Sequence, residues 1–165
     1  MGSLVLVLRV ALGGLLIVAG VLKAIDGPDA TASTIAGYRI LPPFIVAPLG
    51  IFLPYFEIGL GAYLVLGLFV RGAAIVAAAQ FVIFAGAVAS LVIRRIPANC
   101  GCFGSGTNTP PSWGHVGVDL ILAALTLFVA LRGPGALAVD NYLAAKAAPG
   151  DESSSSPTPM RNDTT

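Results

Sequence analysis

The chain has few charged residues, one histidine and two cysteines. The shortage of charge excludes a water-soluble protein. Only 10% of its 165 residues are charged, whereas a soluble domain carries roughly a quarter. A water-exposed surface therefore cannot be built from this sequence. The net charge is +1, and no basic run interleaved with aromatic residues occurs, which argues against nucleic acid as a partner. No Gly-rich phosphate loop follows a strand-like segment.

Hydrophobic residues make up 56% of the chain and gather in four long runs. The runs cover residues 4–25, about 44–70, about 73–93 and about 113–131. A helix rises ~1.5 Å per residue and the hydrocarbon core is ~30 Å thick, so roughly 20 residues cross it. Backbone polar groups must be satisfied within a segment inside lipid, so each run is expected to be a helix. The sequence predicts an all-α, integral membrane four-helix bundle in the cell membrane.

The expected domain organisation is one four-span domain, residues 1–132, followed by a tail. We interpret the first run as a span; the alternative is a cleaved signal peptide. Arg9 lies inside this run, and no clear small-x-small cleavage site precedes polar sequence. Residues 133–147 are a candidate short surface helix. Residues 148–165 are rich in Ser, Pro and Thr and are predicted to be disordered.

Four spans put both termini on one face of the membrane and two loops on the other. These loops cover residues 26–43 and 94–112, and a short turn at Arg71 and Gly72 is expected between the second and third spans. Lys and Arg residues are nearly equal in number at the two faces, so the positive-inside rule gives no orientation.

The only two cysteines form the motif Cys100-Gly101-Cys102 in the second loop. A disulfide between them closes a ring of about eleven atoms, whose strain makes the bond easier to reduce. It encloses almost no chain, so it stabilises the fold very little. Gly101 has no Cβ and permits the unusual dihedrals that such a ring needs. The pair is therefore a candidate catalytic dithiol.

Two other interpretations of the motif stay open. The thiols can be inert, or they can bind a metal together with His115, the only histidine. A closed zinc site needs four ligands and the chain offers at most three, whereas copper(I) accepts two thiolates. If the pair cycles between dithiol and disulfide, an oxidising compartment is its natural setting. The loop then lies outside the cytoplasm and both termini lie inside.

Ionisable side chains inside lipid are costly, so those within the spans are candidate supporting residues. Glu57 lies near the centre of the second span and is expected to be protonated or paired with Lys23 or Arg9. Structural pairing and proton handling explain its burial equally well. Arg9 and Lys23 can instead snorkel to the headgroups, and Asp119 can favour its helix N-terminus through the dipole. Gln80, in the third span, can hydrogen-bond between helices.

The order of these features resembles the MauE branch of the DoxX-like membrane proteins, which is named for methylamine utilisation. The matching elements are Arg9, Ala-Gly-Val-Leu-Lys-Ala at 19–24, Tyr-Arg-Ile-Leu-Pro at 38–42, Pro-Tyr-Phe-Glu at 54–57 and Cys-Gly-Cys-Phe-Gly at 100–104. Together they are spread over most of residues 5–130. The family pattern has an Arg-Asp pair opening the last span, whereas here Val118 precedes Asp119.

The resemblance implies a four-helix bundle that forms or maintains disulfides in exported proteins beside an extracytoplasmic thioredoxin-like partner. In methylotrophs the family supports maturation of a disulfide-rich subunit of methylamine dehydrogenase. We therefore expect a thiol–disulfide oxidoreductase in which Cys100 and Cys102 carry electrons, with Arg94, Arg95 and His115 favouring the thiolate. A quinone is the expected membrane acceptor, by analogy with other four-helix disulfide enzymes.

Two alternatives of another class are a non-catalytic maturation or assembly factor and a metal-binding membrane protein. A small-molecule carrier built around Glu57 has less support, because the spans show no paired broken helices.

Overall fold

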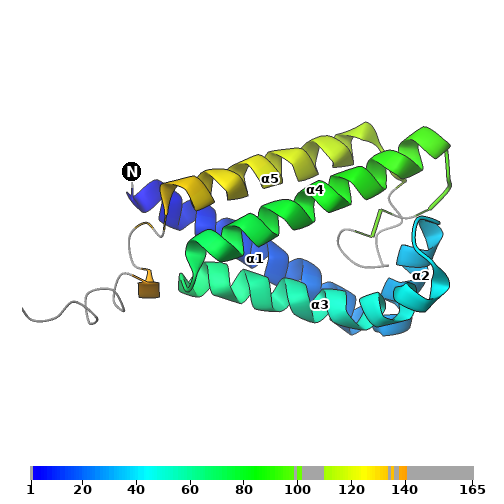
Figure 1. Cartoon of the computed structure of the whole chain (residues 1–165), viewed down its shortest axis with the longest axis horizontal. Coiled ribbons are helices and arrows are strands. Elements are labelled where there is room, and N and C mark those ends of the chain that lie inside the picture. Colours follow the sequence, from blue (N-terminus) through cyan, green and yellow to red (C-terminus); the bar gives the residue numbers. More distant parts are fainter. Residues whose placement is uncertain (1, 99, 102–109, 134, 136–137, 141–165) are drawn as a thin grey trace, which may run out of the picture.

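The computed structural model describes residues 2–98, 100–101, 110–133, 135 and 138–140 (Figure 1). Within these residues the chain forms five helices and no strand: α1 (Gly2–Asp26), α2 (Pro28–Gly37), α3 (Pro43–Leu66), α4 (Val70–Arg94) and α5 (Trp113–Arg132). Four of them, α1, α3, α4 and α5, are long and apolar enough to cross a membrane. The predicted all-α membrane bundle is confirmed.

The long helices pack as two pairs, α1 along α3 and α4 along α5. Glycines bring α1 close to α3, since a Cβ at Gly13 would lie 2.7 Å from the carbonyl oxygen of Gly61. A Cβ at Gly20 would lie 2.6 Å from the carbonyl oxygen of Pro54. Small residues allow this close approach inside lipid, where packing drives helix association. In Figure 1, α3 and α4 meet near their shared turn and diverge toward α2.

The turn between α3 and α4 lies at residues 67–69 and not, as the sequence predicts, at Arg71 and Gly72. Gly67 has a φ of 75°, which ends α3. The Asp140 carboxylate accepts hydrogen bonds from the backbone N–H groups of Phe69 and Val70, at 2.9 and 3.0 Å. A side chain far along the sequence therefore satisfies the first N–H groups of α4, and the local pattern carries no sign of it.

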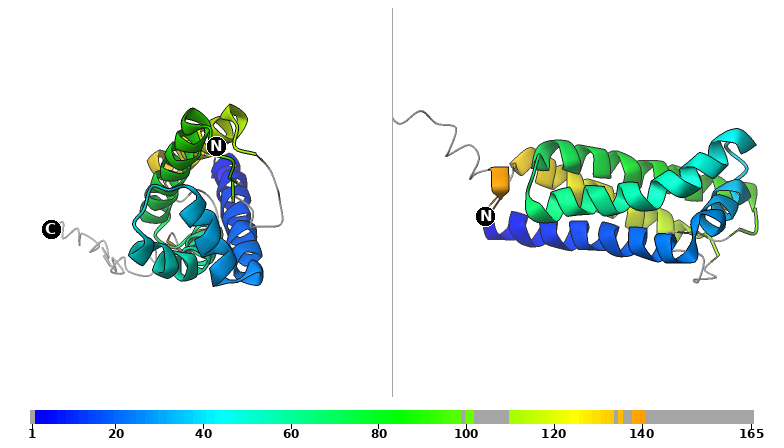
Figure 2. Two further views of the ribbon diagram at one scale, coloured as in Figure 1. Left: turned by 90° about the vertical axis from the view of Figure 1, so that its right-hand side faces the viewer. Right: turned by 90° about the horizontal axis from the view of Figure 1, so that it is seen from below.

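The first loop of the sequence analysis, residues 26–43, contains the helix α2. Pro28 opens it with a φ suited to a first helical position. The helix packs across α3 at one end of the bundle, where a Cβ at Gly50 would lie 2.7 Å from the carbonyl oxygen of Pro28 (Figure 2). The predicted surface helix at 133–147 lies mostly outside the described residues, and the predicted disordered tail at 148–165 lies wholly outside them.

Candidate functional site

Each of the four spanning helices contributes a buried polar side chain to one cluster in the interior of the bundle. These side chains are Lys23 of α1, Glu57 of α3, Gln80 of α4 and Asp119 of α5. The Lys23 Nζ donates hydrogen bonds to both carboxylate oxygens of Glu57, each at 2.7 Å. The Gln80 Nε2 donates to Glu57 Oε1 at 3.0 Å. Lys23, and not Arg9, is thus the basic partner that the sequence analysis sought for Glu57.

The close packing of α1 on α3 places this pair. Gly20 lies against Pro54, and Lys23 and Glu57 each follow three residues later on their helices. Lys23 is only 4% exposed, so it does not snorkel to the headgroups. Helix α2 and the start of α3 continue beyond the end of α1 (Figure 2), which covers a lysine that sequence position alone puts near a membrane face.

Arg9 is buried at the other end of the bundle. Its guanidinium packs against Gly67, where a Cβ would lie 2.7 Å from Nη1, and it interacts electrostatically with Asp140. Lys23 follows Arg9 by fourteen residues on α1, which corresponds to roughly 21 Å along a helix. Arg9 therefore belongs to the turn at residues 67–69 and not to the Lys23–Glu57 pair.

Asp119 is a second buried carboxylate beside the pair. It is 6% exposed, and it interacts electrostatically with His115 and Lys23. Its Oδ2 atom has no hydrogen-bond partner in the described part of the chain. Lys23 therefore interacts with carboxylates from two other helices, an arrangement that the sequence analysis did not predict because it depends on how α5 packs.

Cys100 lies at the α2 end of the bundle and is buried among Ala85, Val88 and Val116. The Tyr38 hydroxyl donates a hydrogen bond to its carbonyl oxygen. Gly101 has a φ of 67°, a left-handed conformation that glycine adopts without strain. A Cβ at Gly101 would also overlap the Thr34 side chain of α2. Both conformation and space therefore require glycine there.

The cysteine ring itself lies outside the described residues, because these do not include Cys102. Of the groups expected to favour a thiolate, Arg94 Nη1 donates to the carbonyl oxygens of Tyr38 and Arg39, at 3.0 and 3.4 Å. His115 Nδ1 shares a hydrogen bond with Ser112 Oγ at 2.8 Å. Arg94 therefore helps to hold the segment whose Tyr38 contacts Cys100.

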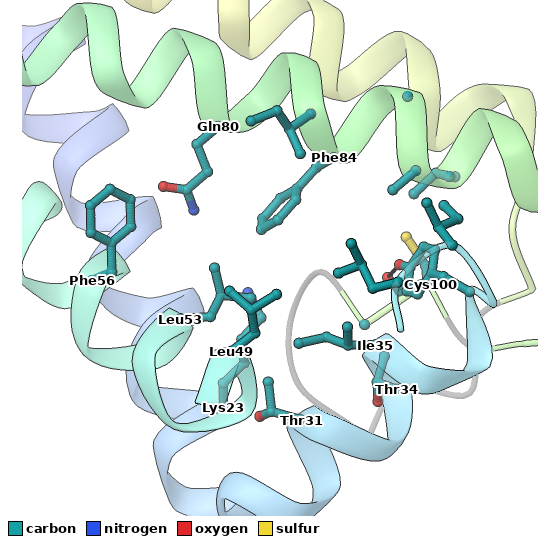
Figure 3. A pocket seen from close by; sticks show the side chains of 18 of the residues that line it. Lys23, Thr31, Thr34, Ile35, Leu49, Leu53, Phe56, Gln80, Phe84 and Cys100 are labelled. Carbon is teal, nitrogen blue, oxygen red and sulfur yellow. Dashed lines mark hydrogen bonds between the residues drawn. The ribbon is translucent and has the colours of Figure 1, made fainter. Parts of the chain in front are cut away.

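An apolar cavity of about 720 Å³ reaches from the buried polar cluster to the cysteine loop. Lys23 and Gln80 line it toward one end, and Cys100 and Gly101 line it at the other (Figure 3). Helices α2, α3 and α4 supply its walls. Its volume falls within the ~300–1,000 Å³ range of small-molecule sites. The cavity is not predicted from the sequence, although Ala79 and Gly86 on α4 line it and leave room for it.

Comparison with known proteins bears on this arrangement. The family model for the methylamine utilisation protein MauE matches residues 1–132. The chain belongs to the MauE family. The match covers all four spanning helices, the buried polar cluster and the cysteine motif. No solved structure matches the chain.

Two curated MauE relatives are similar over most of this chain. The methylamine utilization protein MauE of Paracoccus denitrificans is 34% identical over 124 residues, which are 74% of this chain and 67% of the relative. That of Methylophilus methylotrophus is 37% identical over 114 residues, 68% of this chain and 58% of the relative. The chain therefore spans roughly three-fifths to two-thirds of the MauE relatives it matches.

Metal binding by this MauE-family chain was one of the open interpretations. Within the described residues, no group of three or more His, Cys, Asp and Glu side chains is arranged to hold a metal ion. His115, the expected third ligand, is instead placed on α5 beside Ser112 and interacts electrostatically with Asp119.

Proposed function

We propose that this chain is a membrane thiol–disulfide oxidoreductase that supports disulfide formation in exported proteins. The observation that carries the proposal is the backbone at Gly101, with its positive φ and with the Thr34 side chain in the space that a Cβ would occupy. This glycine separates the only two cysteines of the chain. Any disulfide within the chain must therefore be the short, labile bridge that suits exchange.

The proposed cycle moves two electrons from an exported thioredoxin-like protein to the cysteine pair. A thiolate of that partner attacks the Cys100–Cys102 disulfide, and a mixed disulfide forms. The second partner thiolate then attacks the mixed disulfide. The partner leaves as a disulfide and the pair remains as a dithiol, which a membrane acceptor must reoxidise.

The two cysteines are given different roles in this proposal. Cys100 is 2% exposed and lines the cavity, so it faces the inside of the bundle. We therefore assign the contact with the partner protein to Cys102, and the passage of electrons inward to Cys100. An exported partner requires the cysteine loop on the extracytoplasmic side, with both termini in the cytoplasm.

The curated relatives are named for methylamine utilisation, and we propose that the client proteins belong to that process. The chemistry of the pair selects the class of client: an exported protein that acquires disulfides. The alternative, a non-catalytic maturation factor, requires no sulfur chemistry, so variants that lack the cysteines separate the two.

Trapping of the mixed disulfide tests the proposal. Exchange is reversible, so in the Cys100→Ser variant the free Cys102 thiolate attacks the disulfide of an oxidised partner. We expect this mixed disulfide to accumulate, because Cys100 is no longer present to attack it and release the partner as a dithiol. The Cys102→Ser variant should accumulate little, and the double serine variant none. Non-reducing gels followed by mass spectrometry of the captured protein give the result. Full disulfide content of exported proteins in the double variant would point to the non-catalytic factor.

A further inference from the structure

A groove separate from the apolar cavity lies at the α2 end of the bundle, the end that faces the viewer in the left view of Figure 2. Its volume is about 800 Å³, and it lies between the end of α2, the end of α4 and the segment that leads into α5. The described residues that line it include Arg39, Arg94 and Arg95 and no Asp or Glu. The groove, called the arginine groove below, is therefore strongly basic.

The three arginines of the groove are used differently. Arg94 Nη1 donates to the carbonyl oxygens of Tyr38 and Arg39, so this guanidinium ties α4 to the segment after α2. Arg39 and Arg95 are exposed, and within the part of the chain that the structure describes neither forms an ion pair. A guanidinium group carries five N–H donors. Those of Arg39 and Arg95 are therefore open to an anionic group from outside the chain.

The backbone at these two arginines is strained. Arg39 and Arg95 have φ values of 51° and 53°, in the left-handed region that costs free energy for any residue with a Cβ. The Arg95 N–H donates to the Val92 carbonyl oxygen at 3.3 Å where α4 ends, a place that glycine usually takes. Strain that is kept at a site points to a function of the side chain. The fold favours glycine or asparagine at both places, so the guanidinium groups need a reason of their own.

The arginine groove adjoins the cysteine motif. Thr34 lines the groove, and its side chain also fills the space that a Cβ at Gly101 would occupy. Ala98, which lines the groove as well, precedes Cys100 by two residues. A protein segment that binds in the groove is therefore held next to the two sulfur atoms.

We propose that the arginine groove docks an acidic segment of the exported partner protein, close to the cysteine that the partner exchanges. This inference rests on the proposed function and names the chemistry that recognises the partner: carboxylates that pair with Arg39 and Arg95. Arginine binds a carboxylate through two parallel hydrogen bonds, which fix its orientation. A lipid phosphate is the other anion that arginine binds. The position beside the cysteine motif favours the partner, because exchange requires it to bind there.

Activated peptides test the docking separately from the redox cycle. The full-length Cys100→Ser variant, in nanodiscs of phosphatidylcholine, keeps Cys102 as its only thiol. It is mixed with short peptides whose single cysteine carries a pyridyl disulfide and is flanked by aspartates or by asparagines. The Cys102 thiolate attacks the peptide sulfur, the protein–peptide S–S bond forms, and thiopyridone leaves. Absorbance of the released thiopyridone gives each rate, which is taken relative to the rate of the same peptide with mercaptoethanol.

We expect the aspartate peptide to react about tenfold faster than the asparagine peptide at low salt. The advantage should vanish in about 1 M NaCl, where the Debye length is ~3 Å. Arg39→Gln and Arg95→Gln should each lower it, whereas Arg71→Gln, which removes an exposed arginine at the other end of the bundle, should not. The asparagine peptide should react equally with all these proteins, because a change in thiolate reactivity would alter the rates of both peptides.

Asparagine variants keep the test decisive if the glutamine variants do not fold. Arg39→Asn and Arg95→Asn remove the charge and introduce a residue that tolerates the left-handed conformation. We expect both to raise the melting temperature and to lower the advantage of the aspartate peptide. Lower melting temperatures would show that these arginines serve the fold, and would overturn the docking role.

The outcomes separate this inference from the proposed function. Equal rates for the two peptides, or an advantage that the Arg39 and Arg95 variants keep, overturn the docking; a mixed disulfide trapped in cells then still supports the exchange function. An aspartate advantage in a chain that never forms a mixed disulfide in cells supports an acid-binding groove and overturns the exchange function.

A lipid occupant has its own signature. Native mass spectrometry from nanodiscs that also contain phosphatidylglycerol would show this lipid retained by the parent and lost from Arg39→Gln/Arg95→Gln. That result, together with equal rates for the two peptides, would assign the arginine groove to lipid headgroups and overturn the docking.

Discussion

At the scale of single residues, the Lys23–Glu57 pair shows how a membrane protein holds charge away from water. Charges inside lipid are costly, so the sequence predicts that Glu57 is protonated or paired with a basic group such as Lys23 or Arg9. The structure decides between them. Both lie on α1, but only Lys23 lies three residues beyond the contact of Gly20 with Pro54, where it reaches Glu57. The position of Asp119 beside Lys23 is a property of packing between distant helices and has no local signal.

Removal of one member of this pair should be much worse than removal of both. Lys23→Met leaves the Glu57 carboxylate buried without its base, and we expect a loss of about 3–5 kcal/mol in stability. Lys23→Met/Glu57→Leu should recover most of that loss. Thermal unfolding in detergent measures the stability of the parent, the single variant and the double variant. A Lys23→Met protein as stable as the parent would contradict the pairing.

The backbone conformation of Gly101 is expected to affect how readily Cys100 and Cys102 form a disulfide. Gly101→Ala has to hold an alanine at a φ of 67° against Thr34, a strain on the order of 1–2 kcal/mol. We expect slower formation of the Cys100–Cys102 bridge, measured by timed alkylation after removal of reductant. Thr34→Ser, which removes the crowding methyl group, should restore part of the rate. Gly117→Ala on α5, where a Cβ meets nothing, is the control.

At the scale of helices, the sequence predicts the four spans well and their boundaries less well. Hydrophobic length is local, and it identifies each long helix. The start of α4 is not determined locally, because Asp140 accepts hydrogen bonds from the Phe69 and Val70 N–H groups, which lie 71 and 70 residues away in the chain. Helix α2 is short, and its place depends on a contact with Gly50 of α3. Its own apolar pattern therefore does not predict it.

Two adjacent glycines on α1 should respond oppositely to alanine. A Cβ at Gly13 would lie 2.7 Å from the Gly61 carbonyl oxygen, whereas a Cβ at Gly14 meets no atom within 4 Å. Gly13→Ala should therefore lower the melting temperature by separating α1 from α3. Gly14→Ala should leave it unchanged or raise it, because alanine favours a helix by about 1 kcal/mol over glycine. Equal effects of the two changes would argue against close α1–α3 packing.

Asp140 provides a second test at this scale. Asp140→Ala removes the acceptor for the Phe69 and Val70 N–H groups, and loss of such a cap costs about 0.5–2 kcal/mol. Hydrogen exchange should show the first turn of α4 opening faster, with the α2 end of the bundle unchanged. Protection at Val70 equal to that of the parent would contradict this role.

At the scale of the whole molecule, the candidate site arises from an arrangement that no segment encodes by itself. The Cys-Gly-Cys motif and the intramembrane charges are visible in the sequence, and their residue types indicate redox and ion-pair chemistry. The cavity that lies between them forms because α3 and α4 diverge (Figure 1) and α2 covers the open end. Small residues on α4 permit this space, but only the packing of three helices creates it.

The most direct measurement of the central claim is the redox state of the two sulfur atoms in intact cells. Cells are treated with a membrane-impermeant maleimide mass tag, with and without a brief prior reduction by an impermeant phosphine. The account predicts that part of the population gains a tag on Cys102, the cysteine assigned to the partner protein, only after reduction and without any permeabilisation of the membrane. Tagging that requires permeabilised cells, or complete tagging regardless of reductant, would contradict an extracytoplasmic pair that cycles between dithiol and disulfide.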